Sequence, residues 1–164
     1  MQKFHFKLTE YDNMCVMGYQ GDEAEVKVPD SFWGKPVTIL GDDVFKGHEE
    51  IEKVILPDTL TDIGGFAFDG CKKLKRIILP DGLLCMWQYA FVRSGLEEIV
   101  IPEKIQSITP STFQDCVNLR RVVCPQGLRT IYTKAFMGCK NLEEILLPEG
   151  VEVSVGAFEG CERL

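Results

Sequence analysis

Residues 74–91 read L-K-R-I-I-L-P-D-G-L-L-C-M-W-Q-Y-A-F, and this pattern of aliphatic, proline and phenylalanine positions returns along the chain. Further copies open at residues 51, 96, 119 and 142, and the copy at 142 is one residue shorter before Val153. An irregular first copy runs from about Glu23 to Glu50. From residue 51 on, the starts are 22 or 23 residues apart. A fixed period of this kind is typical of solenoids built from stacked coils.

Two residue types mark the phase of the repeat. Six of the eight prolines share one repeat position and six of the ten phenylalanines share another. The prolines are Pro29, Pro57, Pro80, Pro102, Pro125 and Pro148. The phenylalanines are Phe45, Phe68, Phe91, Phe113, Phe136 and Phe158, and we expect those of the middle coils to be almost fully buried. Chance does not align residues in this way, so the pattern predicts about six similar coils.

Each copy is expected to contain a short strand that ends at its proline. In the stretch x-x-I-x-I-P, successive side chains point to opposite faces, and proline ends the strand because it has no N–H for the ladder. The expected rungs are 25–28, 53–56, 76–79, 98–101, 121–124 and 144–147. One coil cannot bury its apolar positions alone, whereas stacked coils share a continuous core. The sequence therefore predicts a solenoid with one parallel sheet.

The two ends differ from the middle. Apolar and polar residues alternate over 4–8, and 14–19 reads as a second strand after a turn, so residues 1–22 are expected to form an N-terminal β-hairpin cap. Residues 23–164 would form the solenoid, with coils starting near 23, 51, 74, 96, 119 and 142, in a single domain. No cap is apparent after the last coil. We therefore expect exposure there of Leu142, Ile145, Leu147, Phe158 and Leu164.

The repeat pattern L-x-x-I-x-I-P-x-x-V-x-x-I-x-x-x-A-F-x-x-C resembles the BspA-like (treponemal-type) leucine-rich repeats. Residues 18–22 (G-Y-Q-G-D), 26–29 (V-K-V-P) and 34–37 (G-K-P-V) resemble the usual first coil of that bacterial family. The resemblance covers roughly residues 14–164. It implies a right-handed leucine-rich-repeat solenoid, mainly β with short turns, and roles in adhesion and protein–protein contact at cell surfaces. It implies no catalytic residues.

Composition and charge restrict the classes of partner. A net charge of −7 and a pI near 4.9 argue against nucleic acid and against an anionic membrane surface, both of which call for a Lys/Arg surplus. No apolar run approaches 18 residues, so no membrane insertion is expected. Residues 1–10 lack the apolar core of a secretory signal. The compartment stays open: cytoplasm if the sequence is complete, cell surface if a targeting segment was removed.

The cysteines and histidines favour a structural reading. Four of the seven cysteines share one repeat position: Cys71, Cys116, Cys139 and Cys161. Side chains in such a column run parallel and do not converge on a metal, and parallel Cβ vectors oppose disulfides, so we expect buried free thiols. We expect the same of Cys124, whereas Cys15 and Cys85 stay open. With two histidines and no phosphate-binding glycine loop, we expect no enzyme, cofactor or metal site.

The outer face of the expected strands carries charge and apolar area. The second repeat position holds Glu52, Lys75, Glu97, Arg120 and Glu143, and the third holds Lys53, Arg76, Glu98, Arg121 and Glu144. Opposite charges on adjacent strands attract by roughly 0.2–1 kcal/mol a pair, which would help to order the coils. The fifth position, after Lys27 in the first coil, holds Ile55, Ile78, Val100, Val123 and Leu146.

Two interpretations of this aliphatic column remain open. It could form an apolar patch of a size that marks interaction sites, or its β-branched residues could simply suit strands. Our leading hypothesis is a protein-interaction module whose site joins the aliphatic column to Arg76, Glu98 and Arg121. The alternative is a structural or assembly unit, part of a longer or self-associating solenoid, whose last coil joins further coils or a second copy. An enzyme is a distant third.

Overall fold

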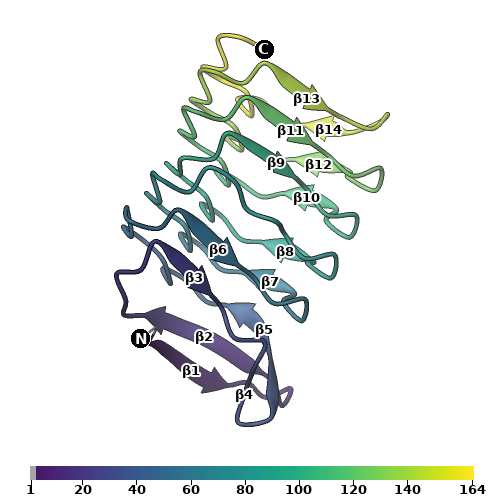
Figure 1. Cartoon of the computed structure of the whole chain (residues 1–164). Helices are drawn as coiled ribbons and strands as arrows, with labels where there is room; N and C mark the ends of the chain where they lie inside the picture. Colours follow the sequence, from purple (N-terminus) through teal and green to yellow (C-terminus); the bar gives the residue numbers. More distant parts are fainter. Residues whose placement is uncertain (1–2) are drawn as a thin grey trace.

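The protein, described here from a computed structural model, folds into a stack of six coils with two rows of short strands (Figure 1). The structure describes residues 3–164, so the first two residues of the expected cap lie outside it. No helix occurs within that range, and the strands of successive coils pair in parallel. The expected solenoid is therefore confirmed.

The first strand row precedes the repeat prolines. It comprises β3 (Glu25–Lys27), β6 (Lys53–Ile55), β9 (Glu98–Val100), β11 (Arg121–Val123) and β13 (Glu144–Leu146). These strands match five of the six expected rungs. Residues 76–79 form no strand, and the row splits into the pair β3–β6 and the three strands β9–β11–β13. The expectation of one continuous sheet was wrong at this coil.

A second strand row, not expected from the sequence, follows the prolines. It comprises β5 (Lys35–Leu40), β7 (Asp62–Ile63), β8 (Cys85–Met86), β10 (Ser107–Ile108), β12 (Thr130–Ile131) and β14 (Glu152–Val153). A short strand β4 (Ser31–Phe32) pairs antiparallel with β5. This row also divides, because β8 pairs with β7 and not with β10. Both rows are thus interrupted between the coils that begin at 74 and 96.

The phenylalanine column is the centre of the core. Phe45, Phe68, Phe91, Phe113 and Phe136 are completely buried, as expected. The rings stack from coil to coil with centroids 4.9–5.5 Å apart, and those of Phe68 and Phe91 are parallel to within 1°. Offset-stacked aromatic rings at this separation stabilise a core beyond their buried area. The column therefore fixes the spacing of the coils.

The cysteine column packs beside the phenylalanines and bonds to them. The thiols of Cys116 and Cys139 donate hydrogen bonds to the carbonyl oxygens of Phe91 and Phe113, at 3.0 and 3.1 Å. All seven cysteines are free, and Cys124 is buried as expected. Cys161 is only half-buried, which contradicts its expected burial. It lies in the last coil, where the stack covers it from one side.

The N-terminal end is capped by the hairpin of β1 (Phe4–Leu8) and β2 (Met14–Tyr19). Strand β2 pairs in parallel with β5, so the hairpin extends the second strand row. The rings of Phe4 and Tyr19 lie 6.4 and 5.4 Å from that of Phe45 and cover the end of the phenylalanine column. The expected hairpin cap is confirmed.

The last coil is open in part. Leu147 and Leu164 are exposed, and Ile145 and Phe158 are half-buried. Leu142, which we also expected to be exposed, is fully buried. It lies at the inward corner before β13, between the preceding coil and its own, so its contacts do not require a further coil.

Candidate protein-binding face

The aliphatic column lies on the outer face of the first strand row. Ile78 is 89% exposed and Val100 is 63% exposed, and Ile55 and Leu146 are also exposed. Val123 is half-buried. The alternation of each strand causes this arrangement, because the residues on either side of the column point into the core. The structure thus brings the expected apolar residues onto one face.

The charged residues beside the column form ion pairs between coils. Arg76 Nε lies 3.1 Å from Glu98 Oε1, and Arg121 Nε lies 3.0 Å from Glu144 Oε2. Lys53 pairs with Glu25 in the same way, at 3.2 Å. These groups are exposed, so each pair contributes little stability, about 0–1 kcal/mol. They remain accessible to a partner as a polar border.

Residues 76–79, the open segment, separate two parts of this face. Elsewhere in the row the backbone is bonded from coil to coil, as where the Ile101 N–H donates to the Val123 carbonyl oxygen at 2.8 Å. Within residues 3–164, no backbone hydrogen bond joins the open segment to β6 or to β9. The nearest backbone hydrogen bond between coils is that of the Glu97 N–H to the Lys75 carbonyl oxygen, at 2.9 Å, one residue before the open segment.

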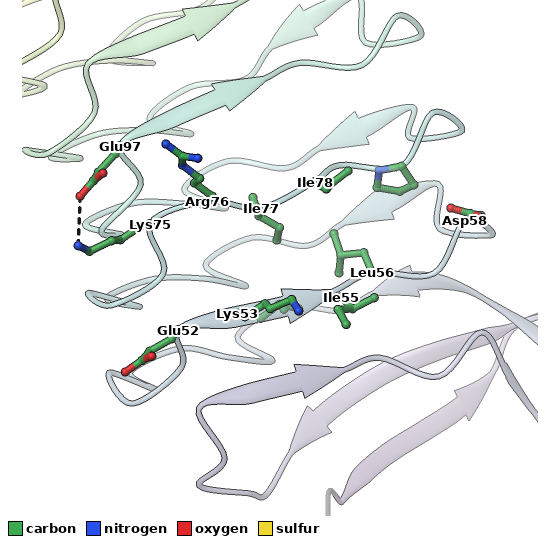
Figure 2. Close-up of a pocket in the computed structure, with 12 residues that line it drawn as sticks. Glu52, Lys53, Ile55, Leu56, Asp58, Lys75, Arg76, Ile77, Ile78 and Glu97 are labelled. Carbon is green, nitrogen blue, oxygen red and sulfur yellow. Dashed lines mark ion pairs between the residues drawn. The ribbon is translucent and has the colours of Figure 1, made fainter.

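A cleft follows each side of the open segment. The first, of about 690 Å³, lies between β6 and the open segment, and Figure 2 shows Ile55 and Leu56 on one wall and Ile77 and Ile78 on the other. The second cleft, of about 500 Å³, lies between the open segment and β9. Inward residues beside the first cleft keep some exposure, 5% at Val54 and 8% at Ile77 against none at Val122, which holds the same repeat position. The first cleft therefore reaches the edge of the core.

Like charges stand across the first cleft. At the third repeat position every neighbouring pair has opposite charge except Lys53 and Arg76, which line opposite walls (Figure 2). Like charges directly opposite on adjacent strands are destabilising. The interruption between β6 and the open segment coincides with the one repulsive pair in the column.

A shortened corner accompanies the second cleft. The repeat loses one residue between Phe91 and Leu96, and Gly95 closes the corner, its N–H donating to the Cys71 carbonyl oxygen at 3.0 Å. A Cβ at Gly95 would lie 1.9 Å from the Lys72 carbonyl oxygen, so only glycine fits. Ser94 stands near the missing cysteine position, with its hydroxyl 3.4 Å from Cys116 Sγ. The short corner thus precedes the strand that fails to pair with the open segment.

The other polar groups of residues 3–164 form no metal cluster, since no group of three or more His, Cys, Asp or Glu side chains is arranged to hold a metal ion. His48 Nδ1 lies 2.6 Å from Glu50 Oε1, in a pair packed beside Tyr19. Burial raises the pKa of the thiols of Cys116 and Cys124 to about 12, which leaves them protonated and weakly nucleophilic. In the same range, no helix is long and apolar enough to cross a bilayer.

Comparison with known proteins gives related sequences and folds. Residues 38–164 match the model of the BspA type leucine rich repeat region in six copies. A leucine-rich repeat protein of known crystal structure from T. pallidum is 34% identical, with a TM-score of 0.82 over 98% of this chain and 87% of that chain. A search of curated proteins found no match.

Two further crystal structures are similar. A leucine rich cell surface protein from Faecalibacterium prausnitzii is 26% identical, with a TM-score of 0.71 over 98% of this chain and 51% of that one. This chain thus spans about half of that protein's length. A pneumococcal vaccine antigen, PcpA, is 22% identical, with a TM-score of 0.67 over 93% of this chain and 44% of its own, and shares the fold.

Proposed function

Because the chain belongs to the BspA-type leucine-rich repeat family, whose members are generally protein-interaction modules and typically non-catalytic, we propose that it binds another protein through its first strand row. The site comprises the aliphatic column and the border of Arg76, Glu98 and Arg121. The observation that carries this proposal is the exposure of Ile78, an aliphatic residue that is 89% exposed at the centre of this face. The relative described as a cell surface protein favours binding of the adhesion type.

The anatomy of this face suits a protein partner. Interfaces place an apolar centre inside a polar border, and a few central residues carry most of the binding energy. Here Ile78 and Val100 occupy the centre, and the paired side chains of Arg76 and Glu98 lie beside them. The two clefts are hollows of this face that a partner's side chains can enter. We therefore expect Ile78 and Val100 to dominate the affinity.

The experiment replaces three residues of the aliphatic column by aspartate. Partners captured by the parent protein from bacterial lysate and from host surface proteins are identified, and their Kd is measured for Ile78→Asp, Val100→Asp and Val123→Asp. Each variant should weaken binding by at least tenfold. The melting temperature should stay nearly unchanged for Ile78→Asp and Val100→Asp, because these two residues face solvent in the free protein. Leu84→Asp, an exposed leucine outside this face, is the matched control. Equal binding by parent and variants would refute the proposal.

A second candidate function is assembly through the last coil. Leu147, Val153, Val155 and Leu164 are exposed there, and β13 and β14 are each paired on one side only. Apolar surface and open strand edges invite pairing with another chain. Light scattering across a range of concentrations should then show self-association that Leu147→Asp abolishes and Ile78→Asp does not. A strict monomer at high concentration would contradict this candidate.

A further inference from the structure

The backbone beside the first cleft lacks the hydrogen bonds that its repeat position normally makes. At the position of Leu56 in three other coils, the N–H groups of Val28, Ile101 and Cys124 donate to the next coil at 3.0, 2.8 and 3.1 Å. The Leu56 N–H has no such acceptor within the described residues, and neither does the Ile78 carbonyl oxygen have a donor. Peptide groups left open along a strand edge are a template for an added strand.

The walls of the first cleft offer apolar contacts on both sides of this open backbone. Ile55 and Ile78 project outward from β6 and from the open segment, and Leu56 and Ile77 form the deeper part (Figure 2). Their small residual exposures, 9% and 8%, show that the cleft reaches the edge of the core. In an extended chain successive side chains point to opposite faces. The side chains on one face of a bound segment would therefore cover Leu56 and Ile77, and those on its other face would contact the rest of the partner.

The charges select the kind of segment. Lys53 and Arg76 stand on opposite walls near the amino ends of β6 and the open segment, and Asp58 lies beyond their carboxyl ends (Figure 2). A carboxylate placed between Lys53 and Arg76 would attract both, turning the repulsive pair into an attractive triplet. The cleft is therefore complementary to an apolar segment with an acidic residue at one end.

We infer that the first cleft binds an extended segment of the protein partner by main-chain hydrogen bonds to β6 and the open segment, with an acidic side chain between Lys53 and Arg76. This inference rests on the proposed function, because it says how a partner engages the same face. The recognition mode is strand addition, in which main-chain bonds give affinity and side-chain pockets give specificity.

The test starts from a display library of random heptapeptides selected on the parent protein. Enriched peptides should alternate β-branched or aromatic residues with others and carry Asp or Glu at one end. In synthetic form, they should slow amide hydrogen exchange at Leu56 and at residues 76–79. N-methylation of alternate peptide nitrogens should weaken binding at least tenfold, because it removes main-chain donors and leaves the side chains intact. No enrichment, or no slowing of exchange at these amides, would overturn the inference.

A charge-swapped variant tests the acidic contact. Glu25→Lys with Lys53→Glu keeps an opposite-charge pair between β3 and β6 but places a carboxylate opposite Arg76. The selected peptides should bind this variant at least tenfold more weakly, and exchange of the amides at 76–79 should slow in the absence of peptide. Arg121→Glu with Glu144→Arg, away from the first cleft, is the matched control and should bind as the parent does. Equal affinity of the peptides for the parent and for the Glu25→Lys, Lys53→Glu variant would contradict the proposed contact between an acidic side chain and Lys53 and Arg76.

The same measurements separate this inference from the proposed function. If Ile78→Asp loses the captured protein while peptides fail to enrich, the outer face binds by side chains alone. The proposed function then stands and strand addition falls. If neither the captured protein nor the peptides respond to Ile78→Asp, both fall.

Discussion

Arg93 holds the buried carboxylate of Asp69 with two hydrogen bonds, from Nη2 at 2.7 Å and from Nε at 3.0 Å. Asp69 is 2% exposed, whereas the Arg93 side chain is largely open to solvent. The carboxylate raises the pKa of Arg93 by these hydrogen bonds. The pair ties the corner of one coil to the corner of the next.

Arg93→Ala should destabilise the fold more than loss of an ordinary surface arginine. It would leave Asp69 buried without its charged partner, which costs about 1–3 kcal/mol. Arg163→Ala, which removes an exposed pair with Glu143, should cost no more than about 1 kcal/mol. Urea unfolding of both variants measures the difference. Equal costs would mean that solvent or another group compensates Asp69.

Phe113→Ala should be among the most damaging single changes. The ring is fully buried, between those of Phe91 and Phe136 at 5.5 and 5.2 Å, so its removal leaves a cavity in the column. The expected cost is roughly 3–5 kcal/mol, seen as a large fall in melting temperature. Tyr132→Ala, at an exposed aromatic, should shift the melt little. An unchanged melt for Phe113→Ala would mean that the coil phase is misassigned.

Thiol labelling should divide the cysteines into two groups. Cys71, Cys116, Cys124 and Cys139 are buried, and burial raises their pKa, so they should react only after denaturation. The half-buried Cys15, Cys85 and Cys161 should react in the native protein, although slowly near neutral pH because burial raises their pKa as well. Mass spectrometry of labelled peptides identifies the sites. Rapid native labelling of Cys116 or Cys139 would contradict their place in the core.

Tyr19 should make stability depend on alkaline pH. Burial and a hydrogen bond to the Glu23 carboxylate raise the pKa of its hydroxyl to about 12, against about 10 in an unfolded chain. Between these values the unfolded chain releases a proton that the folded protein keeps, so this contribution to stability is present below pH 10 and is lost as the pH rises to 12. Tyr19→Phe removes the titrating group, so its urea unfolding free energy should fall less steeply over pH 10–12 than that of the parent. Parallel pH profiles would refute this role.

The sequence predicted the coils because proline and phenylalanine recur at positions that the fold uses in the same way each time. It did not predict the second strand row. Apart from β5, the strands of this row are two residues long and form where stacked coils bring backbone groups together. Five of the six corners two residues before the phenylalanine have positive φ at a non-glycine residue, including Phe66 and Tyr89. Such residues do not signal a turn in a sequence, because neighbouring coils impose this conformation.

The candidate face was predictable in part for a related reason. Outward positions follow from alternation, so the aliphatic column could be placed from residue order alone. The break at the open segment could not, since Ile77, Ile78 and Leu79 continue the strand pattern without change. Two signals were present: the like charges of Lys53 and Arg76, and the residue missing near Ser94. Each signal indicates a break in the strand row only when the residues of neighbouring coils are compared position by position.

Both strand rows are interrupted between the coils that begin at 74 and 96, and this interruption makes the stiffness of the stack uneven. Across that junction the remaining backbone links lie mainly on the phenylalanine side, where the Phe91 and Arg93 N–H groups each donate at 2.9 Å, to the carbonyl oxygens of Thr112 and Gln114. Among the described residues no strand pairing crosses this junction, and beside the first row a single backbone hydrogen bond remains, from the Glu97 N–H to the Lys75 carbonyl oxygen. The junction is therefore a joint that flexes about the aromatic column and resists sliding along it. Under a pulling force, the elastic compliance of the molecule would concentrate at this joint, with a more rigid block on either side.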